Sequence, residues 1–174
     1  MIKRYKAAIK HANTKTIFRK LRHSLRATKA RSCWKNAHLL LFSGIATPAP
    51  YAFVEKRWGP FRLDSYYVCA FNDFPTAAEK YQYQLPTKQE IIWFKKLLET
   101  LFLAQIYYRD FHADNILISD DGIIAIDINS VKDFSSKTSH QFLCQHRKDK
   151  SRFLRDWKSK PEQLQCFSEV FGKN

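Results

Sequence analysis

A mostly buried helix followed by a short hairpin is the pattern that most constrains the fold of this chain. Thr87 and Glu90 have the spacing of a capping box, which predicts that a helix begins there. Apolar residues recur with the helical period and flank that stripe widely, so a helix is predicted over 87–107 with most of its surface buried. Two short apolar runs follow, at 116–119 and 123–126, and the Asp-Asp-Gly between them favours a tight turn. We therefore expect a buried helix that leads through a polar loop into a two-stranded hairpin.

The rest of the chain also mixes strands with helices. The other predicted elements are a strand over 1–6, a helix over 28–43 stopped by Gly44, strands over 51–55 and 65–71, a connection over 74–86, and a basic helical tail over 140–171 broken at Pro161. This mixture predicts an α+β fold. The length of 174 residues suits a single domain.

Composition excludes several classes of protein. Hydrophobic residues make up 45% of the chain and aromatic residues 15%, which excludes a disordered chain. No apolar run approaches the ~20 residues that a membrane span needs. The N-terminal residues lack the apolar core of a secretory signal, so a cytoplasmic location is expected. The four cysteines have no zinc spacing and stand beside apolar residues, so buried free thiols are expected.

The charge of the chain, +14 in total, is unevenly distributed. Residues 1–54 carry twelve Lys or Arg and no acid, and 132–174 carry ten bases and five acids, whereas 55–131 are slightly acidic. Such asymmetry favours an anionic partner, which could be nucleic acid, an acidic membrane surface or a phosphorylated substrate. The alternative is a basic, solvated surface with no dedicated partner.

Side chains suited to binding a metal ion and transferring a proton surround the predicted hairpin. Asp110 and Asn115 are five residues apart on the loop after the buried helix, and Asp127 ends the second strand. Because a hairpin reverses the chain, the twelve residues between Asn115 and Asp127 allow the two to meet in space. Taken singly, each residue is equally well explained as a loop cap or a turn residue. Taken together, they favour one shared site.

This stretch, from Tyr107 to Asn129, resembles the catalytic loop and metal-binding strand of the protein-kinase-like fold, where H-R-D-x-x-x-x-N is followed by D-F-G. Asp110 matches the Asp of H-R-D, Asn115 the Asn, and Asp127 the Asp of D-F-G, although no Gly follows it. More narrowly, the chain resembles the bacterial lipopolysaccharide kinase family (InaA/WaaP-like) over about residues 1–160. That likeness is carried by KRYK, ARSCWKNAHLLLFSGIATPAPYAFVE, SYYV and RDFHADNIL.

The resemblance implies an ATP-dependent transfer of a phosphoryl group to an alcohol. It gives Asp110 the role of base for the acceptor hydroxyl, and it gives Asn115 and Asp127 the role of holding Mg²⁺ through oxygen atoms. His112 stands where protein kinases usually carry a Lys, and we expect it to contact the transferred phosphate. Ala70 and Phe71 fall where the hinge between the lobes should run, so their backbone groups are expected to face adenine.

The N-terminal part departs from the kinase pattern. Lys3 matches the strand Lys that grips the α- and β-phosphates, and only two residues precede it, so the Gly-rich phosphate loop is expected to be missing. Residues 1–71 are therefore predicted to form a partial N-lobe, consisting of the Lys strand, the following helix and two further strands. Residues 72–174 are predicted to form a small, mainly helical C-lobe that carries the catalytic-loop hairpin. Kinases usually pair the strand Lys with a Glu on the next helix, but here Cys33 stands near that place.

Several functions remain open on the sequence alone. The first is a kinase that acts on lipopolysaccharide core sugar at the inner face of the cytoplasmic membrane, where the basic ends would face anionic lipid and a phosphorylated acceptor. The second is a pseudokinase or nucleotide-binding remnant, supported by the missing Gly-rich loop. A small atypical protein kinase is the third, because the same loop serves protein acceptors. A nucleic-acid binder ranks last, because aromatic residues are sparse among the bases of the N-terminal third.

Overall fold

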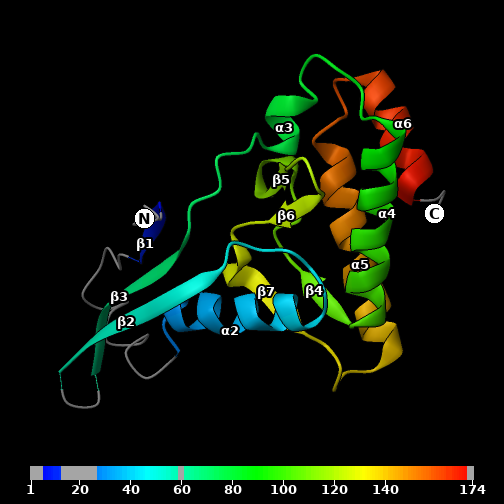
Figure 1. The fold of residues 1–174 in the computed structure, drawn as a ribbon. Coiled ribbons are helices and arrows are strands. Elements are labelled where there is room, and N and C mark those ends of the chain that lie inside the picture. The colour runs from blue at the N-terminus through cyan, green and yellow to red at the C-terminus, as the bar shows by residue number, and fades with distance from the viewer. Residues whose placement is uncertain (1–5, 13–26, 59–60, 172–174) are drawn as a thin grey trace.

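The computed structural model describes residues 6–12, 27–58 and 61–171, and it shows a small sheet with one helix beside a group of further helices (Figure 1). The sheet is antiparallel and its strands follow the order β1 (Ala7–Ala12), β3 (Phe61–Ala70), β2 (Pro50–Trp58). Residues 1–5 of the strand predicted over 1–6 lie outside the described residues, and the described strand β1 begins just after it.

The helix α2 (Lys29–Phe42) covers one face of this sheet. It begins at Thr28, whose side chain accepts a hydrogen bond from the Arg31 N–H, and it ends before Gly44, which has φ +79°. Side chains alternate along a strand, so Tyr67 and Cys69 share one face of β3, and both are buried. The helix predicted over 28–43 is confirmed, and Gly44 stops it as the sequence indicates.

The rest of the chain is mainly helical and contains two short strand pairs. Its elements are α3 (Ala77–Lys80), α4 (Lys88–Leu103), β4 (Ile106–Tyr108), η1 (Ala113–Asn115), β5 (Ile116–Ile118), β6 (Ile123–Ala125), η2 (Ile128–Ser130), β7 (Val131–Asp133), α5 (Ser139–Arg155) and α6 (Pro161–Phe171). Strand β5 pairs with β6 as predicted, and β4 pairs with β7. Helices α4, α5 and α6 lie side by side (Figure 1). None of the described helices is both long enough and apolar enough to cross a membrane.

Two sequence predictions about this part need correction. The helix predicted over 87–107 begins as expected, with Thr87 and Glu90 forming a capping box, but it ends at Leu103. Gln105 has φ 51°, which breaks the helix, and residues 106–108 pair as β4 with β7. The connection over 74–86 contains the short helix α3, which is capped by Thr76 and Glu79 with the same three-residue spacing as at α4.

Aromatic rings form the core between α4, α5 and α6. The ring of Phe153 lies 5.3 Å from that of Phe94 and 5.0 Å from that of Phe167, and Trp157 stacks on Phe167 at 5.2 Å. All four side chains are buried. Burial of this much aromatic surface is the main stabilising contribution here, because each ring removes a large apolar area from water.

Replacing Phe153 by Ala should therefore destabilise the protein strongly. The exposed fraction of Phe153 is 0%, so the truncation leaves a cavity between three helices, and we expect a loss of about 3–5 kcal/mol in urea unfolding. Phe42→Ala is the matched control, because Phe42 is 94% exposed at the end of α2 and its loss should change stability by less than about 0.5 kcal/mol. Equal effects of the two substitutions would contradict this assignment of the core.

His146 on α5 should make stability depend on pH. The imidazole is buried against Phe142 and Phe102, and burial, aided by Lys150, lowers its pKa to about 4. Between pH 7.5 and 5 the unfolded chain gains a proton at this position that the folded chain does not take up. Stability should therefore fall on acidification, by up to about 2 kcal/mol from this group.

Urea unfolding of wild type and His146→Gln at pH 7.5 and pH 5 measures this contribution. The variant should lose less stability on acidification than the wild type. His140→Gln is the control, because His140 is exposed on the same helix and its replacement should leave the pH dependence unchanged. An identical acid-induced loss in wild type and His146→Gln would rule out the contribution of His146.

Candidate functional site

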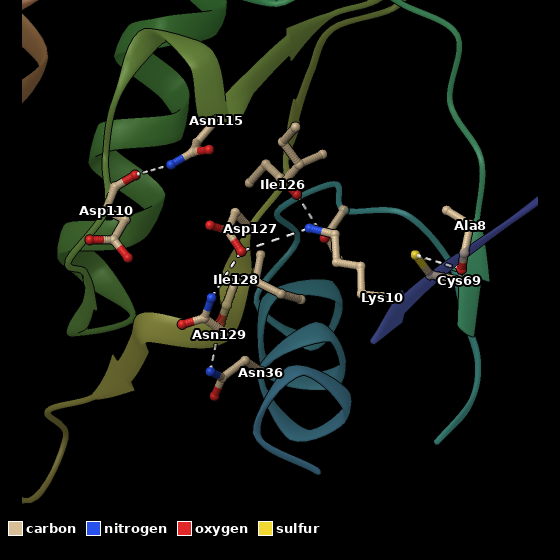
Figure 2. Close-up of polar contacts among 12 residues, drawn as sticks. Ala8, Lys10, Asn36, Cys69, Asp110, Asn115, Ile126, Asp127, Ile128 and Asn129 are labelled. Atoms are coloured by element: carbon tan, nitrogen blue, oxygen red, sulfur yellow. Dashed lines mark hydrogen bonds and ion pairs between the residues drawn. The ribbon is translucent and has the colours of Figure 1, made fainter. Parts of the chain in front are cut away.

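The loop between β4 and β5 holds the first two predicted site residues in a fixed relation. The Asn115 Nδ2 group donates a hydrogen bond of 2.8 Å to the backbone oxygen of Asp110. This bond closes the loop and fixes the rotamer of the Asn115 amide. The amide oxygen is left on the side where Asp127 lies (Figure 2).

Asp127 follows β6 in an unusual backbone conformation, with φ 54° and ψ 50°. This left-handed geometry costs a non-glycine residue about 1–2 kcal/mol, although Asp tolerates it better than most residues. The side chain is held by Asn129, whose Nδ2 donates to Asp127 Oδ1 at 2.9 Å. The Lys10 Nζ lies 3.7 Å from the same oxygen, so β1 and the hairpin meet at this carboxylate (Figure 2).

The hairpin brings the loop and Asp127 together, as the sequence predicts. The Ile126 N–H donates to the Asn115 oxygen at 2.9 Å, which sets the start of β5 beside the residue that precedes Asp127. The buried hydroxyl of Tyr108 donates to the backbone oxygen of Ile126 and lies 3.3 Å from that of Asn115. Figure 2 shows Asp110, Asn115 and Asp127 grouped on one side of the hairpin. The structure thus brings these three predicted residues together.

Residues of helix α5 hold the loop between β4 and β5 in place. Asp149 is buried, and its Oδ2 accepts the Tyr108 N–H at 3.0 Å. Arg152 Nη1 donates to Asp149 Oδ1, to the Tyr107 hydroxyl and to the Arg109 backbone oxygen at 2.8–3.1 Å. Burial raises the pKa of Asp149 to about 8, against the opposing effect of the Tyr108 N–H and Arg152. Asp149 is therefore costly to ionise, and the Tyr108 N–H and Arg152 stabilise its carboxylate. The loop depends on these contacts.

Asp156, two turns further along the chain, anchors the second half of the loop. Its Oδ2 accepts the Ala113 N–H at 2.8 Å, and its Oδ1 lies 3.2 Å from His112 Nδ1. Residues seven apart share a helix face, so Asp149 and Asp156 are on the side of α5 that faces the loop. The His112 ring is thus held by Asp156, and its predicted contact with a transferred phosphate stays a prediction.

A cavity of about 170 Å³ lies between the sheet and the hairpin. Its wall includes Lys10 and Asp127, and also Ala70 and Phe71 from the predicted hinge at the end of β3. Most of the remaining wall is apolar. The Ala70 N–H donates to the Ala49 oxygen at 2.9 Å and the Phe71 N–H donates to the Lys6 oxygen at 3.0 Å. Any backbone contact from these two residues to a ligand would therefore have to come from their carbonyl oxygens.

The lysine that reaches this site is Lys10. Lys3, the lysine chosen by resemblance, lies outside the described residues. Cys33 on α2 is close enough for Lys10 and Asp127 to act on its thiol, and burial raises the pKa of that thiol to about 11. Cys33 is therefore neutral near pH 7 and offers Lys10 no negative charge. The ion pair described for Lys10 is the one with Asp127.

The donor set suits a hard cation that also binds phosphate. In the part of the chain that the structure describes, no group of three or more His, Cys, Asp or Glu side chains gathers into a metal site. Mg²⁺ is usually held by one or two carboxylates together with substrate phosphates and water, so it does not need such a cage. The Asp127 carboxylate and the Asn115 amide oxygen fit that requirement. Zinc, which prefers Cys and His ligands, does not fit these residues.

Comparison with known proteins rests on solved structures. No protein-family model and no curated protein matches the chain. WaaP in complex with acyl carrier protein has 19% identity and a TM-score of 0.49, over 82% of this chain and 72% of that one. The Rio2 kinase of Chaetomium thermophilum, in an ADP/Mg²⁺-phosphoaspartate complex, has 12% identity and a TM-score of 0.52, over 84% of this chain and 45% of that one.

The fold is protein-kinase-like. The predicted fold class is thus confirmed, although the chain spans less than half the length of the Rio2 chain. At such low identity the likeness concerns the fold alone. The predicted division at 71/72 falls just after β3, and the assignment of residues 1–71 to a partial N-lobe stays a prediction.

Some residues of the candidate site escaped the sequence prediction. Residues 7–10 read Ala-Ala-Ile-Lys, which is close to the V-A-I-K pattern of the kinase strand and points to Lys10. The sequence indicates Asp149 and Asp156 only weakly, because acidic residues are scarce in the basic tail. Each accepts a hydrogen bond from a backbone N–H group some 40 residues earlier, and no spacing rule predicts such contacts.

Removing the Tyr108 hydroxyl should weaken the whole site. Tyr108→Phe leaves the backbone oxygens of Ile126 and Asn115 without this donor in a buried place, and we expect a loss of about 1–3 kcal/mol in urea unfolding. Tyr83→Phe removes an exposed hydroxyl and should change stability by less than about 0.5 kcal/mol. If both variants unfold like the wild type, the hydroxyl does not join the loop to the hairpin.

Proposed function

We propose that this protein is an ATP-dependent phosphotransferase. The observation that carries the proposal is the meeting of Lys10 and Asp127 in the wall of an apolar cavity, with the Nζ and Oδ1 atoms 3.7 Å apart. One side chain comes from the sheet and the other from the hairpin. A cation beside a carboxylate that can hold a metal ion is what a nucleoside triphosphate requires, because its phosphates need both.

Each residue then has a chemical role. Lys10 would contact the α- and β-phosphates, and Asn115 and Asp127 would hold Mg²⁺. When bound, Mg²⁺ neutralises charge on the β- and γ-phosphate oxygens. The apolar part of the cavity would enclose the base. These roles need side chains from both the sheet and the hairpin, and the ion pair between Lys10 and Asp127 is a contact between the two.

Asp110 is placed to act on the acceptor. Its backbone oxygen receives the Asn115 amide, so its position relative to the metal-binding residues is fixed. In the proposed step the Asp110 carboxylate takes the proton of an acceptor hydroxyl as that oxygen attacks the γ-phosphorus. The bond between the γ-phosphorus and the β,γ-bridging oxygen breaks, and ADP leaves with the electron pair.

An anionic acceptor is the class that the surface favours. A groove of about 510 Å³ runs along α5 and continues to Leu164 on α6. The charged residues that line it are all basic: Lys148, Arg152, Arg155 and Lys158. Arg152 also contacts the Arg109 backbone next to Asp110, so the groove adjoins the proposed base. We propose a phosphorylated lipid or lipopolysaccharide precursor as the acceptor, reached at an anionic membrane surface.

Mg²⁺-dependent binding of ATP tests the nucleotide site. At 100 times the dissociation constant, ATP with Mg²⁺ should add about 2.7 kcal/mol to the stability and raise the Tm by a few degrees. Asp127→Ala should abolish the part of this shift that depends on Mg²⁺, because it removes the carboxylate that would hold the ion. Asp121→Ala is the matched control, because Asp121 is an exposed residue of the hairpin turn.

Turnover is a separate measurement. Asp110→Ala should keep the Mg²⁺-ATP shift and lose phosphoryl transfer or, without an acceptor, slow ATP hydrolysis. A wild-type protein that binds Mg²⁺-ATP but never hydrolyses or transfers it would support a nucleotide-binding remnant, which the neutral thiol of Cys33 near Lys10 also favours. The absence of any nucleotide-induced shift in folded wild type would overturn the proposal.

A further inference from the structure

Two residues that line the cavity between the sheet and the hairpin, the proposed nucleotide cavity, each carry a buried polar atom without a partner in the described part of the chain. These atoms are the Asn72 Oδ1 and the Tyr67 hydroxyl oxygen, which are buried and form no hydrogen bond within the described residues. Most of the surrounding wall is apolar, with Ala8, Leu117 and Ile128 among its residues. Buried polar atoms normally find partners, so each exception asks for an explanation.

The position of Asn72 indicates what its partner would be. The residue follows Phe71 directly, at the point where the chain leaves β3 and passes the cavity. The N–H groups of Ala70 and Phe71, its two predecessors, already donate to the Ala49 and Lys6 oxygens. The backbone here therefore offers few donors to the edge of a bound base. A carboxamide side chain offers one acceptor and two donors, which is what reading such an edge requires.

We propose that the Asn72 side chain recognises the 6-amino group of adenine. This inference rests on the proposed nucleotide site and names the residue that would select the base. The Oδ1 atom accepts a hydrogen bond from the exocyclic amine, and the Nδ2 group donates to the adjacent ring nitrogen. Asn pairs with the edge of adenine in this two-bond manner in protein–DNA recognition. Guanine carries an oxygen at that position, so Oδ1 would meet an acceptor instead of a donor.

The stability of the free protein should distinguish this role from a structural one. An Asn that held the hinge through hydrogen bonds would destabilise the protein when replaced by Leu. Here the Oδ1 atom is unpaired, so Asn72→Leu, which has nearly the same size, should leave the free protein at least as stable as the wild type. Binding can then be compared between proteins that are equally folded.

The decisive experiment compares ATP with purine riboside 5′-triphosphate, which lacks only the 6-amino group. Calorimetric titration with Mg²⁺ should show that the wild type binds ATP about tenfold more tightly than this analogue. Asn72→Leu should bind both nucleotides equally, and more weakly than the wild type binds the analogue, because the wild type keeps the bond from Nδ2 to the ring nitrogen. Asp73→Ala is the control, because Asp73 is the next residue, is exposed, and should leave the tenfold ratio unchanged.

The possible results separate the two proposals. Equal binding of ATP and the analogue by the wild type would overturn the role of Asn72, and so would a tenfold ratio that persists in Asn72→Leu. In both cases the nucleotide site itself would stand. If the wild type binds neither nucleotide, the proposed phosphotransferase function fails, and the role of Asn72 fails with it.

Discussion

The burial of Tyr108 is the constraint on which the site depends. Its N–H donates to Asp149 on α5, and its hydroxyl contacts the backbone oxygens of Ile126 and Asn115. One residue thus joins the helical core, the loop and the hairpin that positions Asp127. Burial raises the pKa of its phenol far above the ordinary range, with the charges of the nearby Asp residues adding to the effect, so the hydroxyl stays protonated and keeps its donor. A neutral donor suits this position, because a negative charge here would repel the nearby Asp127 carboxylate.

The ion pair of Lys10 with Asp127 is the second constraint on the site. It differs from the first because neither side chain is buried. Both side chains are partly exposed, so the ion pair contributes little to stability by itself. Asp127 also adopts a left-handed backbone that costs free energy. The cost is offset by the surrounding bonds: Asn129 donates to the Asp127 side chain, and Asn36 on α2 donates to the Ile128 oxygen at 2.7 Å. A carboxylate held in a strained conformation and paired only weakly is available to exchange its partner for a ligand.

The sequence predicted the parts of this fold that depend on local rules. The capping box of Thr87 and Glu90, the stop at Gly44 and the Asp-Asp-Gly turn involve residues within a few positions of one another, and the hairpin follows from that turn. What could not be predicted depends on distant partners. The end of α4 is set by pairing of β4 with β7 some 25 residues later, and this pairing overrides the helical periodicity of residues 104–107. Lys10 was detectable from Ala-Ala-Ile-Lys, but an alternating basic stretch at 1–6 offered a competing choice. The roles of Asp149 and Asp156 were not detectable, because their contacts with the loop are to residues some 40 positions earlier in the sequence.

Helix α5 connects the stability of the loop with the proposed binding of an acceptor. Arg152 belongs to both, because it lines the basic groove and also donates to Asp149, Tyr107 and the Arg109 backbone. Lys148, Arg155 and Lys158 crowd like charges around it, which is unfavourable in the free protein. An anion in the groove would relieve that repulsion without displacing Arg152 from the loop. Its charge would then lie next to the backbone that carries Asp110, so the same helix that stabilises the proposed base would also bring the acceptor to it.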